Sequence, residues 1–548
     1  MNGAEFIVKT LEAHGITHVF GIPGAKVDSV FIALLDSPIE LVLCRHEQNA
    51  AFMAQAMGRM TGTIGVCIAT SGPGVTNLVT GLATATTEGD PVLAIGGEVS
   101  TDDRYKHCHQ SLDAISLMEP VTKYAKTALN AHDLPEVLGN AIRAAECGRR
   151  GAAFLGLPKD IGLGEISDCE PSARWGQSIR LGSASSDLIA EANRRIRQLK
   201  QPMLLLGLQT SDPSCSEALM RFVRNSGLPY ASTFQAAGRW VAPEQFVGRL
   251  GLFRNQPADR LLDASDGVIC IGFDPVEYDA SIWNSDNNRS LISVDVAPPD
   301  QDRAFLPDVE LVGDLSDTLQ ALSAAGAADI NPEFLALATA SAAELTSTAA
   351  EGASMTGMPM HPLRVVHELH QLVTPETTVA LDVGSHYIWM NRYLPTEHAR
   401  QVLVSNGQQT LGVALPWAIA ANLAHPNQPV IAVCGDGGFL FTATELETAV
   451  RIGCRFVLLI WDSQSYDMVE FQEQAHYGRV SGIKLSYYDA VKFAESFGCK
   501  GYVVTDSETF REVLQDALQQ TVPAVIQIPI DYSDNIKLMQ NIHQSFIH

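Results

Sequence analysis

Short apolar runs that end in glycine-containing turns alternate with helical patterns along nearly the whole chain, and this alternation most constrains the fold. The first runs are THVFGIPG at residues 17–24, IELVLCRHE at 39–47 and GVCIATSGPG at 65–74. Each run precedes a stretch with helical periodicity, which is the pattern of parallel strands joined by helical crossovers. The sequence therefore predicts an α/β fold of parallel sheets flanked by helices.

The alternation falls into three blocks, as expected for 548 residues, which are too many for one hydrophobic core. The polar segment SDCEPSARWGQSIRLGSASSD separates the first two blocks, and the loop EGASMTGMPMH separates the last two. We predict three domains, which comprise residues 1–170, 185–345 and 356–548. The first and third blocks share a layout in which glycine-rich turns follow strands, at the edge where open parallel sheets bind ligands.

The charge and composition of the chain indicate which kinds of molecule it can bind. The chain has 62 acidic and 37 basic residues, which gives a net charge of -25. This excess repels nucleic acid and anionic membrane surfaces, so we expect a small-molecule partner. No run of eighteen apolar residues and no basic leader with an apolar core occurs, and we expect a cytoplasmic protein without a membrane anchor. The ten cysteines include no CxxC pair and are expected to be buried free thiols.

The turn GDGG at residues 435–438 lies between the apolar run PVIAVC and the helical pattern TATELETAVRIG. Its glycines let the backbone approach a ligand and direct amides toward an anion. Asp436 would repel a phosphate unless a divalent cation lay between them, and Mg²⁺ commonly takes one or two protein ligands together with phosphate oxygens. The turn therefore indicates a diphosphate bound through Mg²⁺, and a tight turn with a solvated aspartate is the alternative.

A second set of potential ligands follows the next apolar run, CRFVLLIW, in the segment DSQSYDMV at residues 462–469. Together the two stretches resemble the bipartite cofactor motif of thiamine-diphosphate enzymes. In that family an asparagine or aspartate in the second stretch binds the metal, and alignment through DMV places Ser463 at this position. The main-chain carbonyl of Ser465 is the third implied contact. Serine is a weaker, neutral ligand, and Asp462 just before it is an alternative.

Thiamine catalysis needs a carboxylic acid beside the aminopyrimidine ring, because proton exchange there creates the tautomer that removes a proton from the thiazolium ring. The stretch VLCRHEQNAAFMAQAMGR supplies Glu47 at the junction of an apolar run and a helix, where a carboxylate can be removed from water. Glu47 matches the activating glutamate of the family. In isolation, a glutamate in the first turn of a helix more often stabilises the helix dipole.

Separate stretches over nearly the whole chain resemble catabolic acetolactate synthases, which work without FAD. They include FGIPGAKVDSVF, RHEQNAAFMA, TSGPGVTNL, HQSLD, SNGQQTLGVALPWAI and GDGGFL. The resemblance implies a thiamine-diphosphate-binding fold with an N-terminal pyrimidine-binding domain, a central Rossmann-like domain and a C-terminal diphosphate-binding domain. It also implies condensation of two pyruvates to 2-acetolactate, with release of CO₂ through a hydroxyethyl-thiamine diphosphate intermediate.

The functional residues of that family carry over individually. Lys26 in PGAK and Gln110 in HQSLD match polar groups beside the substrate. Gln472 in MVEFQEQ matches a position where biosynthetic relatives carry a tryptophan that favours 2-ketobutyrate as acceptor. Leu411 in QQTLGVALP matches the apolar residue that holds the cofactor in its bent form. Catalytic roles are therefore expected for Glu47, Lys26, Gln110 and Gln472.

The resemblance also implies where the cofactors bind. The implied cofactor contacts are Glu47, Gly384, Ser385, His386, Gln408, Leu411, Gly435, Asp436, Gly437, Gly438, Ser463, Ser465 and Tyr466. The implied metal ligands are Asp436, Ser463 and Ser465, with Asp462 as the alternative. Thiamine diphosphate and Mg²⁺ are the expected cofactors. FAD is not expected, because FDPVEYDASIWN replaces the turn found in flavin-containing relatives.

The family places its cofactor between subunits, with Glu47 of one chain facing Asp436 of the other. We therefore expect at least a homodimer and favour a homotetramer. Pyruvate is the expected substrate, and the sequence leaves open whether its product enters acetoin and butanediol formation or branched-chain amino acid synthesis.

Two alternatives remain. One is another thiamine-diphosphate enzyme, either a 2-oxoacid decarboxylase or an acetohydroxyacid synthase that uses 2-ketobutyrate. Lys26, Gln110 and Gln472 argue against it. The other is a catalytically degenerate paralogue with a binding or assembly role, and only Ser463 supports it.

Overall fold

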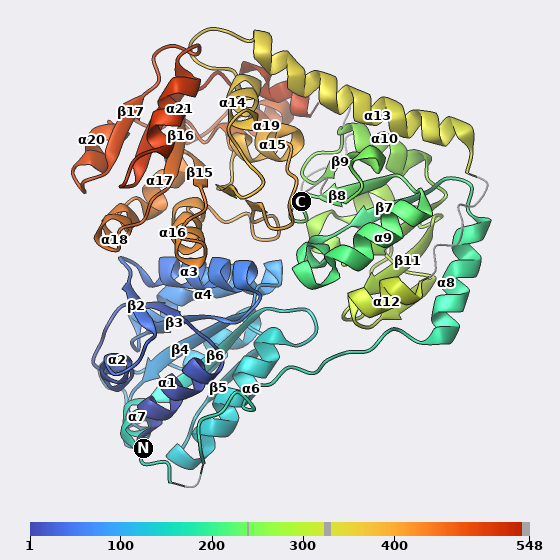
Figure 1. Cartoon of the computed structure of the whole chain (residues 1–548). Coiled ribbons are helices and arrows are strands. Elements are labelled where there is room, and N and C mark those ends of the chain that lie inside the picture. The colour runs from blue at the N-terminus through green and yellow to red at the C-terminus, as the bar shows by residue number, and fades with distance from the viewer. Residues whose placement is uncertain (168, 238–240, 323–329, 540–548) are drawn as a thin grey trace.

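Three six-stranded sheets follow one another along the chain (Figure 1). The computed structural model describes residues 1–167, 169–237, 241–322 and 330–539. All paired strands of the three sheets run parallel. The predicted α/β class, with three helix-flanked parallel sheets, is therefore confirmed. Among the described residues, no helix has both the length and the apolar character that a membrane span requires.

The first sheet has the strand order β2-β1-β3-β4-β6-β5. Its strands are β1 (His18–Gly21), β2 (Glu40–Leu43), β3 (Gly65–Ala69), β4 (Val92–Glu98), β5 (Tyr124–Thr127) and β6 (Ala152–Pro158). Its helices are α1 (Gly3–Ala13), α2 (Asp28–Leu34), α3 (Glu47–Thr61), α4 (Pro73–Glu88), α5 (Ala114–Met118), α6 (Leu134–Glu146) and α7 (Lys159–Leu163). Gly21 pairs with Leu43 on one side and Ile68 on the other, so β1, β2 and β3 end at one edge.

The middle sheet has the order β12-β11-β10-β7-β8-β9. Its strands are β7 (Pro202–Leu206), β8 (Tyr230–Thr233), β9 (Phe246–Leu250), β10 (Gly267–Ile271), β11 (Ser290–Asp295) and β12 (Val309–Val312). Its helices are α8 (Ser186–Gln198), α9 (Ser216–Ser226), α10 (Pro257–Ala264), α11 (Ala280–Trp283) and α12 (Leu315–Ala321). The long helix α13 (Pro332–Glu351) contacts α10 and β9 of this sheet and α14 and α15 of the next (Figure 1).

The third sheet has the order β14-β13-β15-β16-β18-β17, which repeats the order of the first sheet position for position. Its strands are β13 (Thr378–Leu381), β14 (Val402–Leu403), β15 (Val430–Gly435), β16 (Val457–Asp462), β17 (Lys500–Val503) and β18 (Ala524–Pro529). Its helices are α14 (Pro362–His370), α15 (Ser385–Tyr393), α16 (Ala414–Ala424), α17 (Asp436–Thr442), α18 (Glu445–Arg451), α19 (Asp467–Tyr477), α20 (Ala490–Glu495) and α21 (Phe510–Leu518). The predicted likeness of the first and third blocks is confirmed.

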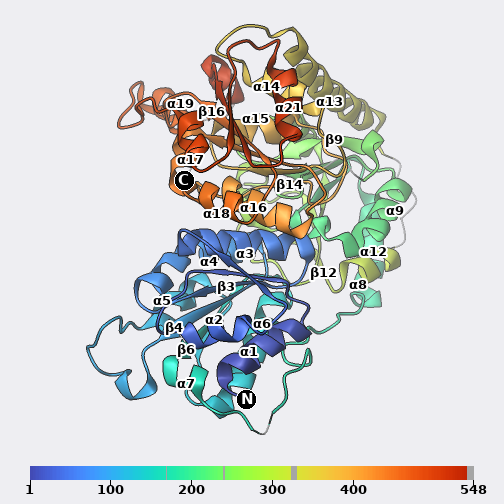
Figure 2. The same cartoon turned by 60° about the vertical axis from the view of Figure 1, so that its left-hand side comes forward.

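The first and third sheets meet through helices whose contact faces are almost wholly apolar. Helix α3 is buried from Asn49 to Arg59 and packs against α16, and Figures 1 and 2 show α3 and α4 directly beneath α16. A single hydrophobic cluster contains side chains from both sheets, so the first and third parts of the chain share one continuous core. At the start of α3, Glu445 accepts hydrogen bonds from the main chain of Arg45 and the side chain of Asn49, both at 2.8 Å.

The cysteines agree only in part with the prediction. All ten are free, and seven are buried. Cys108 is exposed, and Cys147 and Cys169 are partly exposed, in turns and connections of the chain.

Candidate active site

The GDGG turn lies where β15 ends at Gly435 and α17 begins at Asp436. A Cβ on Gly437 would lie 2.6 Å from the Tyr466 ring, and one on Gly438 would lie 2.9 Å from a carboxylate oxygen of Asp382. Only glycine therefore fits at these two positions. The close approach packs the turn against Tyr466 and Asp382 and leaves the Asp436 side chain buried, with 3% of its surface exposed.

Several buried carboxyl groups surround this turn. Burial, together with the charge of nearby Asp462, raises the pKa of Asp436 to about 6. Burial also raises the pKa of Asp467, at the start of α19, to about 7, and one of its oxygens has no hydrogen-bond partner. Carboxyl groups that repel one another in a buried turn provide the hard oxygen donors that a divalent cation requires.

Ser463 and Ser465 lie together at the end of β16. The Ser463 hydroxyl donates a hydrogen bond of 3.2 Å to the main-chain carbonyl of Ser465, so the two predicted ligand oxygens are neighbours. Asp462 accepts a 2.6 Å hydrogen bond from the Gln527 amide on β18. The described residues contain no group of three or more His, Cys, Asp and Glu side chains that could hold a metal ion. A Mg²⁺ site with one carboxylate, completed by neutral oxygens, phosphate and water, is compatible with this finding.

His386 faces the same turn from the first turn of α15. Its ring lies 3.6 Å from where a Cβ of Gly435 would be, and neither ring nitrogen makes a well-formed hydrogen bond. Burial lowers the pKa of His386 to about 3, so the ring is neutral and carries one N–H donor. A buried imidazole whose nitrogens make no well-formed hydrogen bond is free to bind a ligand. Gly384 and Ser385 precede His386. A Cβ on Gly384 would lie only 2.6 Å from the imidazole ring. These residues fit a diphosphate bound with Mg²⁺.

The segment 405–412, which we call the Leu411 loop, connects β14 to α16. Leu411 is half-buried, and the following N–H, of Gly412, donates to both carboxylate oxygens of Asp382, at 2.9 and 3.0 Å. Burial raises the pKa of Asp382 to about 7. Gln408 is exposed and donates to the Thr87 hydroxyl at 2.9 Å. Leu411 therefore lies beside the turn that contains Asp436.

The first sheet forms a separate group of polar residues around the turn Gly72–Gly74, between β3 and α4. Glu47 is half-buried and accepts a 2.9 Å hydrogen bond from the Asn77 amide, and its other oxygen would lie 3.4 Å from a Cβ on Gly74. Gln110 accepts a 3.3 Å hydrogen bond from the Ser71 hydroxyl and packs against Gly72. Two of the predicted catalytic residues thus flank one turn.

The remaining predicted residues lie nearby on each sheet. Lys26 is half-exposed and lies beside Gly97 at the end of β4. Gln472 is half-exposed on α19, five residues after Asp467. Within the described residues, no hydrogen bond joins Glu47 to the turns of the third sheet. A single chain therefore presents two groups of site residues, each at the carboxyl edge of its own sheet.

Three residues of these groups were not predicted as site residues. Asp382 and Asp467 carry the same signal as Asp436, a carboxylate between an apolar strand and a helix, and that signal could have identified them. Asn77 lies within the helix α4, 30 residues from Glu47, and nothing in the local sequence indicates that the two side chains meet.

Comparison with known proteins divides the chain in the same way. Residues 1–117 match the "Thiamine pyrophosphate enzyme, N-terminal TPP binding domain", residues 189–322 the central domain and residues 382–528 the C-terminal TPP binding domain. The chain is 44% identical to an "Acetolactate synthase" of Bacillus subtilis, over 98% of this chain and 94% of that protein. It is also 44% identical to an "Acetolactate synthase, catabolic" of Raoultella terrigena, over 100% and 98%. Identity to the "Acetolactate synthase isozyme 2 large subunit" of Escherichia coli is 29%, over 98% and 97%.

Proposed function

Because this chain belongs to the thiamine pyrophosphate enzymes, among the acetolactate synthases, we propose that it condenses two pyruvate molecules to 2-acetolactate and releases CO₂. The observation that carries the proposal in this structure is the buried Asp436, which accepts a main-chain hydrogen bond from Gln464, between Ser463 and Ser465. The neutral His386 ring lies 3.6 Å from where a Cβ of the adjacent Gly435 would be. This arrangement has a place for a diphosphate and a divalent cation.

The third sheet would hold the cofactors. Asp436, the Ser463 hydroxyl and the Ser465 carbonyl would bind Mg²⁺, and the glycine turn with His386 would bind the diphosphate. The proximity of Ser463 to the Ser465 carbonyl supports Ser463 over Asp462, whose carboxylate is engaged by Gln527. When bound, thiamine diphosphate supplies the electron sink that decarboxylation of a 2-oxoacid requires.

The first sheet would supply the proton chemistry. Glu47 would hold and return a proton at the aminopyrimidine ring, with Asn77 fixing the orientation of its carboxylate. Lys26 and Gln110 would bind the carboxylate of pyruvate and stabilise the charge that develops on its oxygen. Gln472 would line the place of the second pyruvate.

Neither group is complete alone, so we propose that two chains share each site in a homodimer, and we favour a homotetramer. Leu440 and Phe441 on α17, directly after the GDGG turn, are each about half exposed, which supports a covering partner. The ten free cysteines support a reducing compartment, such as the cytoplasm. FAD has no part in the proposal.

Product analysis tests this function. Purified protein would be mixed with pyruvate, thiamine diphosphate and Mg²⁺, without FAD, and a parallel sample would contain a chelator in place of Mg²⁺. We expect acetolactate in the first sample and little in the second. Acetaldehyde in its place would identify a decarboxylase, and a preference for 2-ketobutyrate as acceptor would identify a biosynthetic type of synthase. No turnover and no bound cofactor would indicate a degenerate paralogue.

A further inference from the structure

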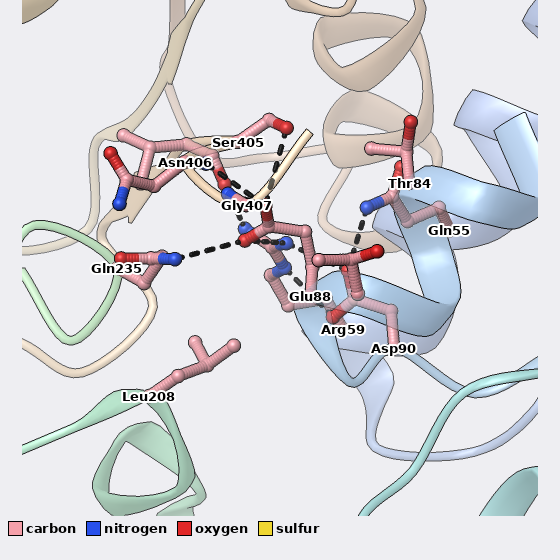
Figure 3. A network of polar contacts seen from close by, with 12 residues as sticks. Gln55, Arg59, Thr84, Glu88, Asp90, Leu208, Gln235, Ser405, Asn406 and Gly407 are labelled. Carbon is pink, nitrogen blue, oxygen red and sulfur yellow. Dashed lines mark hydrogen bonds and ion pairs between the residues drawn. The ribbon is translucent and has the colours of Figure 1, made fainter. Parts of the chain in front are cut away.

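The Leu411 loop is held at its first end by a residue far away in the sequence. Glu88, the last residue of α4, accepts hydrogen bonds from the main-chain N–H groups of Asn406 and Gly407, at 2.9 and 2.8 Å (Figure 3). The same oxygen accepts a 3.3 Å hydrogen bond from the Ser405 hydroxyl. Since Asp382 binds the N–H of Gly412, a carboxylate holds each end of the loop.

Helix α4 also contacts the middle of the loop. The hydroxyl groups of Thr84 and Thr410 lie 2.9 Å apart, and Thr87 accepts the hydrogen bond from Gln408. Residues 84, 87 and 88 share one face of the helix, because they are three and four positions apart. A Cβ on Gly407 would lie 2.3 Å from the Thr87 methyl group, so the loop rests directly on this face.

Groups from all three parts of the chain surround the Glu88 carboxylate. Its second oxygen accepts a 3.4 Å hydrogen bond from Gln235 of the middle part and lies 3.8 Å from the Arg59 guanidinium (Figure 3). Arg59 is itself bound by Asp90, at 2.7 and 2.8 Å. One buried cation therefore serves two buried carboxylates, and Glu88 has 1% of its surface exposed.

A buried carboxylate is unfavourable unless hydrogen bonds and charges compensate its loss of water. An apolar side chain of similar size would fill this position without that penalty. Such a side chain could bind neither the main-chain N–H groups of Asn406 and Gly407 nor the polar groups of Ser405, Gln235 and Arg59. The shortest of these contacts, at 2.8 and 2.9 Å, are to the Leu411 loop, so the path of this loop depends directly on Glu88.

We propose that Glu88 is a positioning residue for the cofactor, which acts by fixing the Leu411 loop against α4. The side chain of Leu411 has no polar group. Its position therefore depends on the contacts of the neighbouring residues 405–410 and Gly412. The proposal rests on the function proposed above, because membership of the thiamine-diphosphate enzymes is what implies that Leu411 contacts the cofactor. The same helix begins at the turn beside Glu47, so α4 contacts functional residues at both of its ends.

The test compares two buried glutamates that accept hydrogen bonds. Glu88→Gln is paired with Glu368→Gln as control, because Glu368 is also buried and binds Arg364 and Arg511, away from the loop.

Two properties of each variant would be measured. Hydrogen exchange of the peptide 402–413 would be followed without cofactor, and the affinity for thiamine diphosphate would be determined by titration in the presence of Mg²⁺. For Glu88→Gln we expect exchange of the loop amides to rise about tenfold and cofactor affinity to fall about tenfold or more. The KM for pyruvate at saturating cofactor should change little.

Glu368→Gln should leave loop exchange and cofactor affinity at wild-type values, even where the two variants lose similar thermal stability. If Glu88→Gln does not fold, Glu88→Asp decides the question, since it keeps the charge beside Arg59 and withdraws the carboxylate from the loop. Wild-type exchange and wild-type cofactor affinity in a folded Glu88 variant would overturn the proposal. An inactive wild-type protein would refute the proposed function alone, because the exchange measurement needs no turnover.

Discussion

The first and third sheets share one strand order but carry different polar side chains at their glycine turns. Both place a glycine turn after the third strand in sequence, at Gly72–Gly74 and at Gly435–Gly438. In the first sheet this turn has no carboxylate, and Glu47 approaches it from the turn after the second strand. In the third sheet the turn itself contains Asp436. The shared topology places both turns at the same edge of their sheets, and in the proposed function one or two side chains decide whether a proton or a cation is handled there.

Glu47 and Asp436 also differ in how deeply the chain buries them and in the charges that lie nearby. Glu47 is half-buried and hydrogen-bonded to Asn77. Asp436 is buried, lies near the charge of Asp462, and has a raised pKa as a result. Main-chain N–H groups of Gly437 and Gln464 compensate Asp436 only in part, since its pKa is still raised. We therefore expect the third sheet to be stabilised most by the proposed cation, and the following substitutions test this expectation.

Glu47→Gln should have the largest effect. It removes the exchangeable proton and keeps the size and hydrogen-bonding capacity of the side chain, so acetolactate formation should fall about 10²- to 10⁴-fold. Affinities for Mg²⁺ and thiamine diphosphate should stay within about threefold of wild type, because Glu47 lies on the other sheet. Steady-state kinetics and cofactor titration would measure both. Undiminished turnover would refute the assigned role.

Asp436→Asn should show the opposite pattern. Loss of the buried carboxylate should weaken Mg²⁺ binding about 10- to 100-fold, and excess Mg²⁺ should recover part of the activity. Calorimetric titration with Mg²⁺ in the presence of thiamine diphosphate would measure the change. Wild-type Mg²⁺ affinity in this variant would mean that Asp436 is not a ligand.

The pH dependence of stability should separate the metal-free protein from the loaded one. The folded-state pKa of Asp436, about 6, lies above its ordinary value of 3.8, so its contribution to stability is present below pH 3.8 and is lost as pH rises through 6. In the absence of metal, Asp436→Asn should therefore raise the melting temperature at pH 7 by a few degrees and have little effect near pH 4. Saturating Mg²⁺ and cofactor should reverse the order at pH 7, because wild type binds them more tightly.

The paired variants Ser463→Ala and Asp462→Asn should sharpen the description of the metal site. We expect Ser463→Ala to weaken Mg²⁺ binding about three- to tenfold, since a neutral oxygen ligand contributes less than a carboxylate. Asp462→Asn should have a smaller effect, because Asp462 is engaged by Gln527. A larger loss in Asp462→Asn would assign the ligand to Asp462.

Gln472→Trp should have the smallest effect on turnover and should alter selectivity. A larger apolar side chain on α19 should favour an acceptor with one more methylene group, which is worth about 1 kcal/mol, or several-fold. Competition between pyruvate and 2-ketobutyrate, followed by product analysis, would measure the ratio. An unchanged ratio would place Gln472 outside the acceptor site.

Local patterns were enough to predict the α/β class, the three sheets and the turns that surround Asp436 and Glu47. Apolar runs, periodicity and glycines act over a few residues, and the sequence shows them directly. The contacts of Asn77 with Glu47 and of Glu88 with residues 405–407 join positions 30 and more than 300 residues apart. The second of these contacts depends on how the first and third sheets pack together through α3 and α16, and no local pattern encodes this packing. Asp382 and Asp467 were missed although they carry the signal that identified Asp436.

The packing of α3 against α16 has a consequence for synthesis of the chain. Helix α3 is complete after residue 61, whereas the apolar face that covers it begins at Ala414. At roughly 5–20 residues per second, the ribosome needs tens of seconds to make the residues between them. During that time Arg59 and Glu88 lack their partners at residues 404–407, and the face of α3 is open to other chains. The nascent first sheet therefore exposes an apolar face for longer than any step of folding within that sheet requires.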